Sequence, residues 1–428
     1  MLMKRSHGLM VAVTATVSIA AYTPFTRPPG CAANNAGLKL PAGFCATLFA
    51  DSLGAPRHLV VAPNGDVIVA IRETRRDSVR VPGGVVILRD ANGDGVADSR
   101  NKFGNFNASE VQLLGNALYT ENSTAILRYR LAPGAMAPSE PPDTIVSGLP
   151  AERGHIAKTF VIYKGQLYVN QGSKTNVCQE KDRVAGSKGI DPCPELSERA
   201  GIWRYSAEKK GQTLKDGDHF ATGIRNAVAM AIEPRSNELY VMQHGRDQLA
   251  DNWPTMFNAE KSAETPAEEL LHVTKGADFG WPYCYFDPEL KKKVLAPEYG
   301  GDGKTVGRCA GKQSNVGTFP GHWAPEGLLF YRGSTLPAHY RQGAFVVFHG
   351  SWNRAPLPQS GFKVVYQPMS KGRATGAYEV FVDGFVGADG KPTELGGRPM
   401  GLAEGRKGEL YLSDDSRGRI WRIQYVGK

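Results

Sequence analysis

Thr159-Phe-Val-Ile-Tyr-Lys164-Gly165-Gln-Leu167-Tyr168-Val is the stretch of this sequence that decides its fold. Aliphatic and aromatic residues flank a Lys-Gly pair, and such a pair suits a tight turn that needs positive φ. The stretch therefore predicts a β-hairpin. Five further stretches follow the same pattern, the fifth along the chain being the loosest: 58–70, 111–119, 228–241, 328–348 and 400–412.

Six hairpins in one chain predict a closed all-β architecture. The period is irregular, roughly 50 residues at its shortest, and further strands such as 126–129 and 420–423 follow several units. Repeated hairpins at this spacing are typical of propellers with about four strands per blade. We therefore expect a six-bladed β-propeller of four-stranded antiparallel blades over residues 40–428. Several unrelated β-sandwiches are the alternative.

The composition agrees with a large globular β protein. The chain has 428 residues, and its 50 glycines and 28 prolines argue against a helical bundle. Its net charge is +9, but the lysines and arginines are scattered, which supports solubility rather than nucleic-acid binding. Beyond the N-terminus no apolar run approaches the roughly 20 residues of a membrane span, which excludes a polytopic membrane protein.

The N-terminus resembles a secretory signal peptide. Lys4-Arg5 precedes a short apolar stretch, 8–21, that ends in small residues. We expect residues 1–22 to be a signal peptide and 23–39 a linker, so the protein would be periplasmic or secreted. An uncleaved anchor helix is the alternative.

The six cysteines agree with export. None forms a C-x-x-C motif, and they fall into three pairs that are local in sequence. Disulfides persist in an oxidising compartment, although spacing alone does not fix the connectivity. We expect the pairs Cys178–Cys193, Cys284–Cys309 and Cys31–Cys45.

Three long irregular segments separate some of the hairpins: 174–200, 246–270 and 284–322. Loops of this length in a compact fold are usually functional or cross-linked. One helix is expected at 265–271, because a threonine and a proline form a plausible start. The segment 90–98 carries oxygen-bearing side chains at alternating positions, which indicates either a calcium loop or an Asx-rich hairpin turn.

Candidate site residues lie next to the repeated strands, because propellers bind ligands at one mouth of the central channel. Arginine, histidine and asparagine recur there, several beside a glycine that lets backbone approach a ligand. Each alone has a structural explanation, but their recurrence at equivalent positions points to a shared site. These residues are His155, Arg225, Asn226, His244, His322, His349, Arg354 and Arg398.

The motifs around these residues resemble the soluble quinoprotein glucose/sorbosone dehydrogenases, six-bladed propellers that use pyrroloquinoline quinone (PQQ) and calcium. The match runs from about Leu40 to the C-terminus. Its best markers are 154–155, 223–226, 244–245, 275–282, 324–325, 349–354 and 397–402. The last two of these motifs and the opening 40–44 look most like the sorbosone-dehydrogenase branch.

The resemblance implies an exported enzyme that oxidises a sugar or a sugar aldehyde by hydride transfer to PQQ. His155 matches the family's general base, and Arg225 would stabilise charge on the C5 oxygen of the quinone. Calcium would bind the backbone carbonyl oxygens of Gly245 and Arg246. A separate electron acceptor is implied, because the chain has no haem motif. Cofactor binding would fall to Arg225, Asn226, His244, His322, Arg354 and Arg398.

The chain departs from the family pattern in two places. Gly154 stands where members often carry an acid, and 107–110 replaces an expected glutamine or histidine loop. The acidic cofactor contact after the fourth unit is open between Asp247, Asp251 and Glu268. A propeller that binds a ligand without catalysis is therefore one alternative. A calcium-dependent lactonase-type hydrolase is another, although the mouth offers arginines and histidines where that chemistry needs carboxylates.

Overall fold

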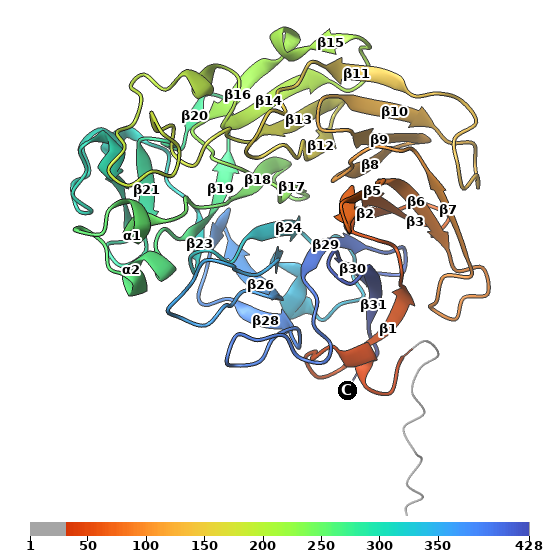
Figure 1. Ribbon diagram of the computed structural model, residues 1–428. Coiled ribbons are helices and arrows are strands. Elements are labelled where there is room, and N and C mark those ends of the chain that lie inside the picture. The colour runs from red at the N-terminus through yellow and green to blue at the C-terminus, as the bar shows by residue number, and fades with distance from the viewer. Residues whose placement is uncertain (1–30, 428) are drawn as a thin grey trace, which may run out of the picture.

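The computed structural model describes residues 31–427, which form six β-sheets arranged as a ring (Figure 1). The expected signal peptide and residues 23–30 of the expected linker lie outside the described residues. In each sheet, or blade, the innermost strand contacts the innermost strand of the next blade, all the way round the ring. These six strands therefore surround a central axis, and the six-bladed propeller is confirmed.

The blades follow one another along the chain, and in each of them four strands succeed one another from the axis outward. Blade 1 has β2 (Pro56–Val61), β3 (Val67–Ile71), β6 (Gly84–Arg89) and β7 (Ser99–Phe103). Blade 2 has β8 (Val111–Leu114), β9 (Ala117–Glu121), β10 (Ile126–Arg130) and β11 (Asp143–Ser147). Blade 3 has β12 (Phe160–Tyr163), β13 (Gln166–Gln171), β14 (Gly201–Ser206) and β16 (Asp218–Thr222).

Blade 4 has β17 (Met230–Glu233), β18 (Glu238–Gln243), β19 (Glu268–Val273) and β23 (Gly317–Phe319). Blade 5 has β24 (Pro325–Leu329), β25 (Gly343–Phe348), β26 (Lys363–Ser370) and β28 (Glu379–Val382). Blade 6 has β29 (Pro399–Glu404), β30 (Leu410–Asp414), β31 (Arg419–Tyr425) and β1 (Phe44–Ala50). Because β1 pairs with β31, strands from opposite ends of the chain close the ring.

Shorter elements extend the blades. Three two-residue strands each add to the sheet of one blade, in blades 2, 3 and 5 respectively: β15 (Gln212–Thr213), β20 (Ala277–Asp278) and β27 (Arg373–Ala374). Two separate hairpins are β4 (Thr74–Arg76) with β5 (Val79–Val81), and β21 (Cys284–Asp287) with β22 (Lys292–Leu295). The helices of the described chain are α1 (Leu249–Asn252), α2 (Ala259–Glu264) and the 3-10 turns Asn35–Gly37, Pro194–Ser197, Leu214–Asp216, Pro297–Tyr299, Gly307–Gly311 and Ala338–Arg341.

Each of the six predicted hairpins forms the two innermost strands of one blade. In the third hairpin Lys164 and Gly165 have φ of +47° and +72°, which is the positive-φ pair that its sequence predicts. The cores lie between blades: Ile202, Val241 and Leu271, from blades 3 and 4, belong to one buried cluster. Apolar inner strands therefore both line the channel and join neighbouring sheets.

The helix expected at 265–271 is wrong. Residues from Glu268 onward form β19, and the short helix α2 lies just before it, capped by the Asn258 side chain. Leu270 and Leu271 pack into different clusters on the two faces of blade 4. Because burial on both faces requires an extended strand at this position, it overrides the weak helix propensity of the segment.

The segment 90–98 is an Asx-rich turn between β6 and β7. The Asp90 carboxylate accepts hydrogen bonds from the backbone amides of Gly93 and Gly95, and Asp98 accepts from Ala91. Side-chain oxygens of the segment therefore satisfy its own backbone.

All three expected disulfides are present: Cys31–Cys45, Cys178–Cys193 and Cys284–Cys309. The last two cross-link the long segments beside blades 3 and 4. Within residues 31–427, no helix has the length and hydrophobicity that crossing a bilayer requires.

The ring closure generates a stability prediction. Trp421 on β31 lies opposite Leu48 of β1 and is fully buried, so Trp421→Ala leaves a cavity at the closing sheet. We expect the free energy of unfolding to fall by about 3–5 kcal/mol. Trp352→Ala, which removes a tryptophan that is 64% exposed, should change it by less than about 0.5 kcal/mol. Urea unfolding followed by circular dichroism measures both, and a loss below about 1 kcal/mol for Trp421→Ala would contradict this view of the closure.

Candidate active site

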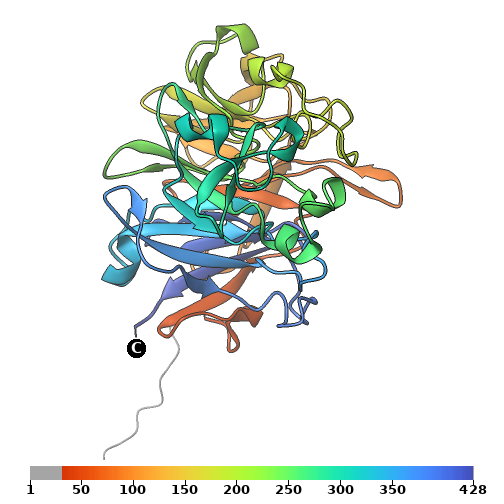
Figure 2. The ribbon, with the colours of Figure 1, turned by 90° about the vertical axis from the view of Figure 1, so that its left-hand side faces the viewer.

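One end of the ring gathers the candidate residues. In every blade the innermost strand begins where the second strand ends, because the two strands are antiparallel. Residues that precede the first strand and follow the second therefore meet at one mouth of the axial channel. Figure 2 shows the ring from the side, with the β4–β5 hairpin and the helices α1 and α2 projecting at the same end.

A buried ionic network crosses the axis below this mouth. Arg57 of blade 1 donates to Glu326 of blade 5 at 3.0 Å and to Asp415 at the end of β30 at 2.8 Å. Burial alone would raise the pKa of Glu326, but the positive charges of Arg57, His244 and His349 together hold that pKa below its usual range. The network therefore joins blades that are not neighbours in the ring.

His58 extends the network to blade 2. Its Nδ1 lies 2.7 Å from the Glu110 carboxylate, and its Nε2 lies 2.6 Å from the backbone oxygen of Glu326. Burial would lower the pKa of His58, but the charge and hydrogen bond of Glu110, together with the backbone oxygen of Glu326, raise it. Side chains from blades 1, 2, 5 and 6 thus meet at one level of the channel.

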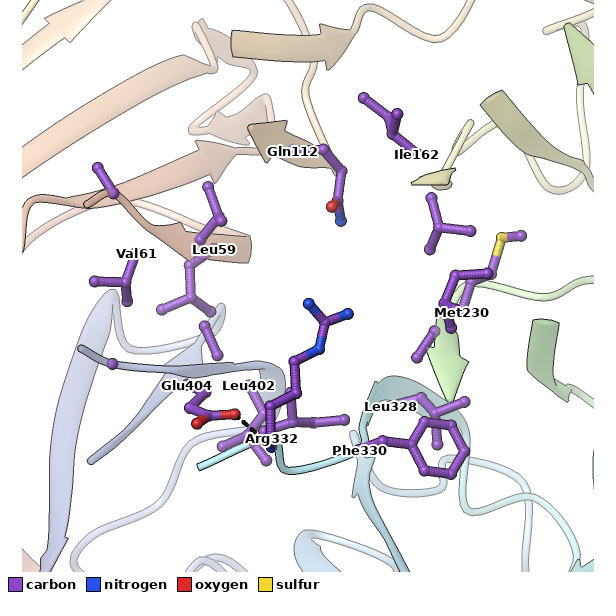
Figure 3. A pocket seen from close by; sticks show the side chains of 18 of the residues that line it. Leu59, Val61, Gln112, Ile162, Met230, Leu328, Phe330, Arg332, Leu402 and Glu404 are labelled. Atoms are coloured by element: carbon purple, nitrogen blue, oxygen red, sulfur yellow. Dashed lines mark hydrogen bonds between the residues drawn. The ribbon is translucent and has the colours of Figure 1, made fainter. Parts of the chain in front are cut away.

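The opposite end of the channel is an apolar cup. Its cavity of about 450 Å³ is lined by residues from all six innermost strands, among them Leu59, Met230 and Leu402 (Figure 3). Gln112 and Arg332 project into it. No histidine of the described residues lines this cup, so the mouth is the candidate active site.

His155 lies in the loop before β12, and its ring is oriented by one neighbour. Its Nδ1 lies 3.0 Å from the backbone oxygen of Ser173. A carbonyl only accepts, so Nδ1 carries the proton in the neutral ring and Nε2 is free to accept one. Burial first, and then the charges of Arg225 and His244, lower the pKa of His155 well below its usual value. The ring is therefore a neutral base at pH 7.

Position 154, directly before His155, has no room for an acidic side chain. Its φ is +65°, and an added Cβ would collide with the backbone carbonyls of Ser173 and Lys174. The loop packs backbone against backbone at this point, so a side chain has no room.

Arg225, before β17, is almost fully engaged. It donates to the carbonyl of Gly245 at 2.8 Å, to both oxygens of Asn176, and to Asp247 at 2.8 Å. Burial would raise the pKa of Asp247, but Arg225 and Arg183 together hold it well below its usual range. Arg225 is therefore fixed in position and reaches one of the two carbonyls expected to bind calcium.

Asp247 links this cluster to the loop after β25. The Asn353 amide nitrogen donates to Asp247 at 3.0 Å and lies 3.3 Å from Nδ1 of His322. The side-chain oxygen of Asn353, Oδ1, is buried and has no hydrogen-bond partner within residues 31–427. A cation or a ligand donor would satisfy this oxygen.

Two more candidates border the mouth from blades 4 and 6. His244, after β18, lies 2.8 Å from the backbone oxygen of Pro325. Arg398, before β29, donates through Nε and Nη2 to the carbonyls of His349 and Gly350, while its Nη1 has no acceptor in the described chain. His155, Arg225 and Arg398 thus lie at the same end of the axis.

The remaining candidates have mainly structural partners. Arg354 donates to the carbonyls of Ala263 and Gly321 and to Glu264, so it holds the end of α2 in this arrangement. His322 contacts the backbone oxygen of Ser262. Asn226 accepts a hydrogen bond from Asn170.

The two residues expected to bind calcium through their carbonyls, Gly245 and Arg246, meet acidic partners at other atoms. The Gly245 amide donates to Glu268 at 2.8 Å, and burial raises the pKa of Glu268 to about 8. The Arg246 side chain forms a buried ion pair with Glu298. Asp251 lies on α1. Of the three acids considered for the site, Asp247 is the one that contacts Arg225.

Several mouth residues were missed from the sequence: Arg57, His58, Arg72, Glu326 and Asp415. Arg57, His58 and Glu326 lie at the start of an innermost strand, and Arg72 and Asp415 directly follow a second strand. Positions of this kind also identified the other candidates. Arg72 is about half exposed and has one ion-pair partner among the described residues, Asp415 at 3.3 Å. The signal was therefore present but was applied to only some of the blades.

Two cavities meet at His155. One, of about 590 Å³, lies over the mouth and is lined by Arg57, Arg72, Asn226 and Glu326. The other, of about 300 Å³, lies beside the 174–183 segment and is lined by Arg153, Lys174 and Arg183. His155 lines both cavities, so a molecule held in either would lie beside its ring.

Fold and site together define a class: a six-bladed propeller with a neutral histidine and a set of arginines at one mouth of its channel. The chain belongs to the TrAA12-like family, whose model matches residues 38–426. The narrower sorbosone-type branch stays a prediction.

One relative matches most of the chain and another about half of it, both at low identity. A pyrroloquinoline quinone-dependent sugar dehydrogenase of Hypocrea jecorina is 22% identical over 425 residues, 92% of each chain. An uncharacterized protein of Borreliella burgdorferi is 30% identical over 208 residues, and the match spans about half the length of each chain.

Solved structures share the fold. The holo pyranose dehydrogenase PQQ domain of Coprinopsis cinerea has a TM-score of 0.72 at 20% identity, covering 90% of this chain and 97% of that one. The calcium structure of a Trichoderma reesei family AA12 enzyme has a TM-score of 0.73 at 18% identity, covering 91% and 97%.

The electrostatics of His155 generate a prediction. Because Arg225 is the charge that lowers its pKa most, Arg225→Gln should raise the pKa of His155 toward its ordinary value of about 6.5. NMR titration of the ligand-free protein measures this, with Arg235→Gln at a distant hairpin turn as the control. A wild-type pKa at or above about 6.5 would contradict the assignment of a neutral base.

Proposed function

We propose that this protein is an exported quinoprotein that oxidises a sugar or a sugar aldehyde at the mouth of the propeller, with PQQ as cofactor. The observation that carries the proposal is His155, whose Nδ1 is fixed by Ser173 and whose Nε2 is free beside two cavities. Family membership and the names of the relatives support the reaction class. The three disulfides support an oxidising compartment.

The mouth fits a polyanionic cofactor such as PQQ. Within the described residues, Nη1 of Arg398 has no hydrogen-bond acceptor. The only ion-pair partner of Arg72 in that part of the chain is Asp415. These free donors suit carboxylates, and the cavity of about 590 Å³ is within the usual range for a cofactor site. We assign cofactor binding to Arg398, Arg72 and Asn226, with Arg225 and His244 at its border.

A calcium ion fits the oxygen atoms beside Arg225. The Gly245 and Arg246 carbonyls and the unpaired Asn353 oxygen are the hard ligands that Ca²⁺ prefers. Because Arg225 already donates to Gly245, calcium would compete with a guanidinium for that carbonyl. Water and cofactor would complete the set, since no cluster of three or more His, Cys, Asp or Glu side chains suited to a metal occurs among residues 31–427.

The chain's own residues supply the proton chemistry. Nε2 of His155 would take the proton of the sugar hydroxyl while the adjacent carbon loses a hydride, so the sugar leaves as a lactone, or as an acid if the substrate is a hydrated aldehyde. Bound PQQ would supply the two-electron acceptor, which a separate external acceptor reoxidises. Arg225, held by Asp247 and Asn176, would stabilise negative charge that develops beside it.

Reconstitution tests the proposal. Purified protein with PQQ and Ca²⁺ should reduce a dye acceptor when glucose or another aldose is added. His155→Ala should bind PQQ normally but lose turnover by about 10²–10⁴-fold, because it removes only the base. His339→Ala, an exposed histidine paired with Glu379, is the matched control and should retain activity.

Two outcomes would contradict the proposal. Absence of PQQ binding in absorbance titrations would favour a propeller without quinone chemistry. Retained turnover in His155→Ala would remove His155 from the role of base.

A further inference from the structure

Three cations line the 300 Å³ cavity beside His155, and two of them form no hydrogen bond or ion pair through their side chains within the described chain. The guanidinium of Arg153 and the ammonium of Lys174 make no hydrogen bond or ion pair within residues 31–427. Arg183, the third cation of the lining, pairs with Asp247 at 2.8 Å. Both free cations therefore face the cavity beside His155.

Few acids offset these charges. The acid in the lining is Asp182, whose carboxylate accepts a hydrogen bond from the Asn176 amide. Glu152 lies nearby but pairs with Arg199 at 3.1 Å, and its side chain is 74% exposed. The cavity therefore has a net positive charge and attracts anions.

The walls of the cavity are held in place. The Glu195 carboxylate accepts hydrogen bonds from the backbone amides of Lys174 and Thr175, and the Cys178–Cys193 disulfide closes the same segment. On the facing side, the backbone at Gly154 packs directly against the carbonyls of Ser173 and Lys174. Arg153 and Lys174 thus project from two loops in close contact, with His155 between them and the mouth.

We propose that this cavity binds the anionic group of the substrate, so the preferred substrate is a hexose whose terminal carbon carries a carboxylate or a phosphate. The inference rests on the proposed function, because it needs His155 to be the base and the larger cavity to hold the cofactor. Arg153 and Lys174 bind the anion, and the carbon to be oxidised, at the other end of the sugar, is presented to His155. Binding of this kind weakens as salt rises, because the rim is exposed.

Binding to the cofactor-free protein tests the inference without any turnover. In calorimetry at low salt, glucuronate and glucose 6-phosphate should each bind at least about tenfold more tightly than glucose, and the tighter of the two identifies the anionic group. The double variant Arg153→Gln/Lys174→Gln should lose roughly tenfold in affinity for the preferred anion. Lys181→Gln, an exposed lysine on the same segment outside the cavity, should bind as the wild type does.

Turnover gives the second readout. With PQQ and Ca²⁺, the double variant should lose roughly tenfold in kcat/KM for the anionic sugar and keep its value for glucose within about twofold. Its affinity for PQQ should be unchanged.

The outcomes separate this inference from the proposed function. Failure to bind PQQ or to oxidise any sugar overturns the proposed function, while calorimetry still decides whether the cavity takes anions. Equal binding of glucose and both anionic sugars, or unchanged anion binding in the double variant, overturns the inference alone. Weaker PQQ binding in the double variant also overturns it, because the two cations would then belong to the cofactor site.

Discussion

The site depends on one constraint of the fold: in every blade the innermost strand begins at the end of the axis where the second strand finishes. Polar residues placed at these two positions must therefore meet at a single mouth, however far apart they lie in sequence. Arg57 and Asp415 are separated by 358 residues and still form a buried ion pair at 2.8 Å. The closing pair of β1 and β31 keeps this geometry by holding the six blades in one ring.

The polar mouth and the apolar cup divide the axial channel into two chemically different ends. Between them, Arg57, His58, Glu110 and Glu326 are buried but paired, so their charges are compensated where water is excluded. Three groups without a hydrogen-bond partner within the described chain lie above this level: Nε2 of His155, Nη1 of Arg398 and the buried side-chain oxygen of Asn353. This division puts the histidine and the arginine with free donor or acceptor atoms at the polar mouth.

Much of the fold could be predicted from sequence because its signals are local. The Lys164-Gly165 turn and its flanking apolar residues specify a hairpin by themselves, and six such hairpins imply six blades. The positions of His155, Arg225 and Arg398 followed from the same pattern. Partners distant in sequence could not be predicted: nothing in the sequence near Arg354 indicates that Ala263 and Gly321 take its donors, or that Arg225 donates to Gly245. The segment 265–271 failed because packing on both faces of blade 4, rather than local propensity, decides its conformation.

The central claim is that free cations and a neutral histidine from separate blades hold a quinone cofactor at this mouth. The most direct measurement is a crystal structure of the protein soaked with PQQ and Ca²⁺. The account predicts electron density for the cofactor in the larger cavity, beside His155 and in contact with Arg398, with the metal at the Gly245 carbonyl. Cofactor density in the apolar cup beside Arg332, or at the outer surface of the blades, would contradict it.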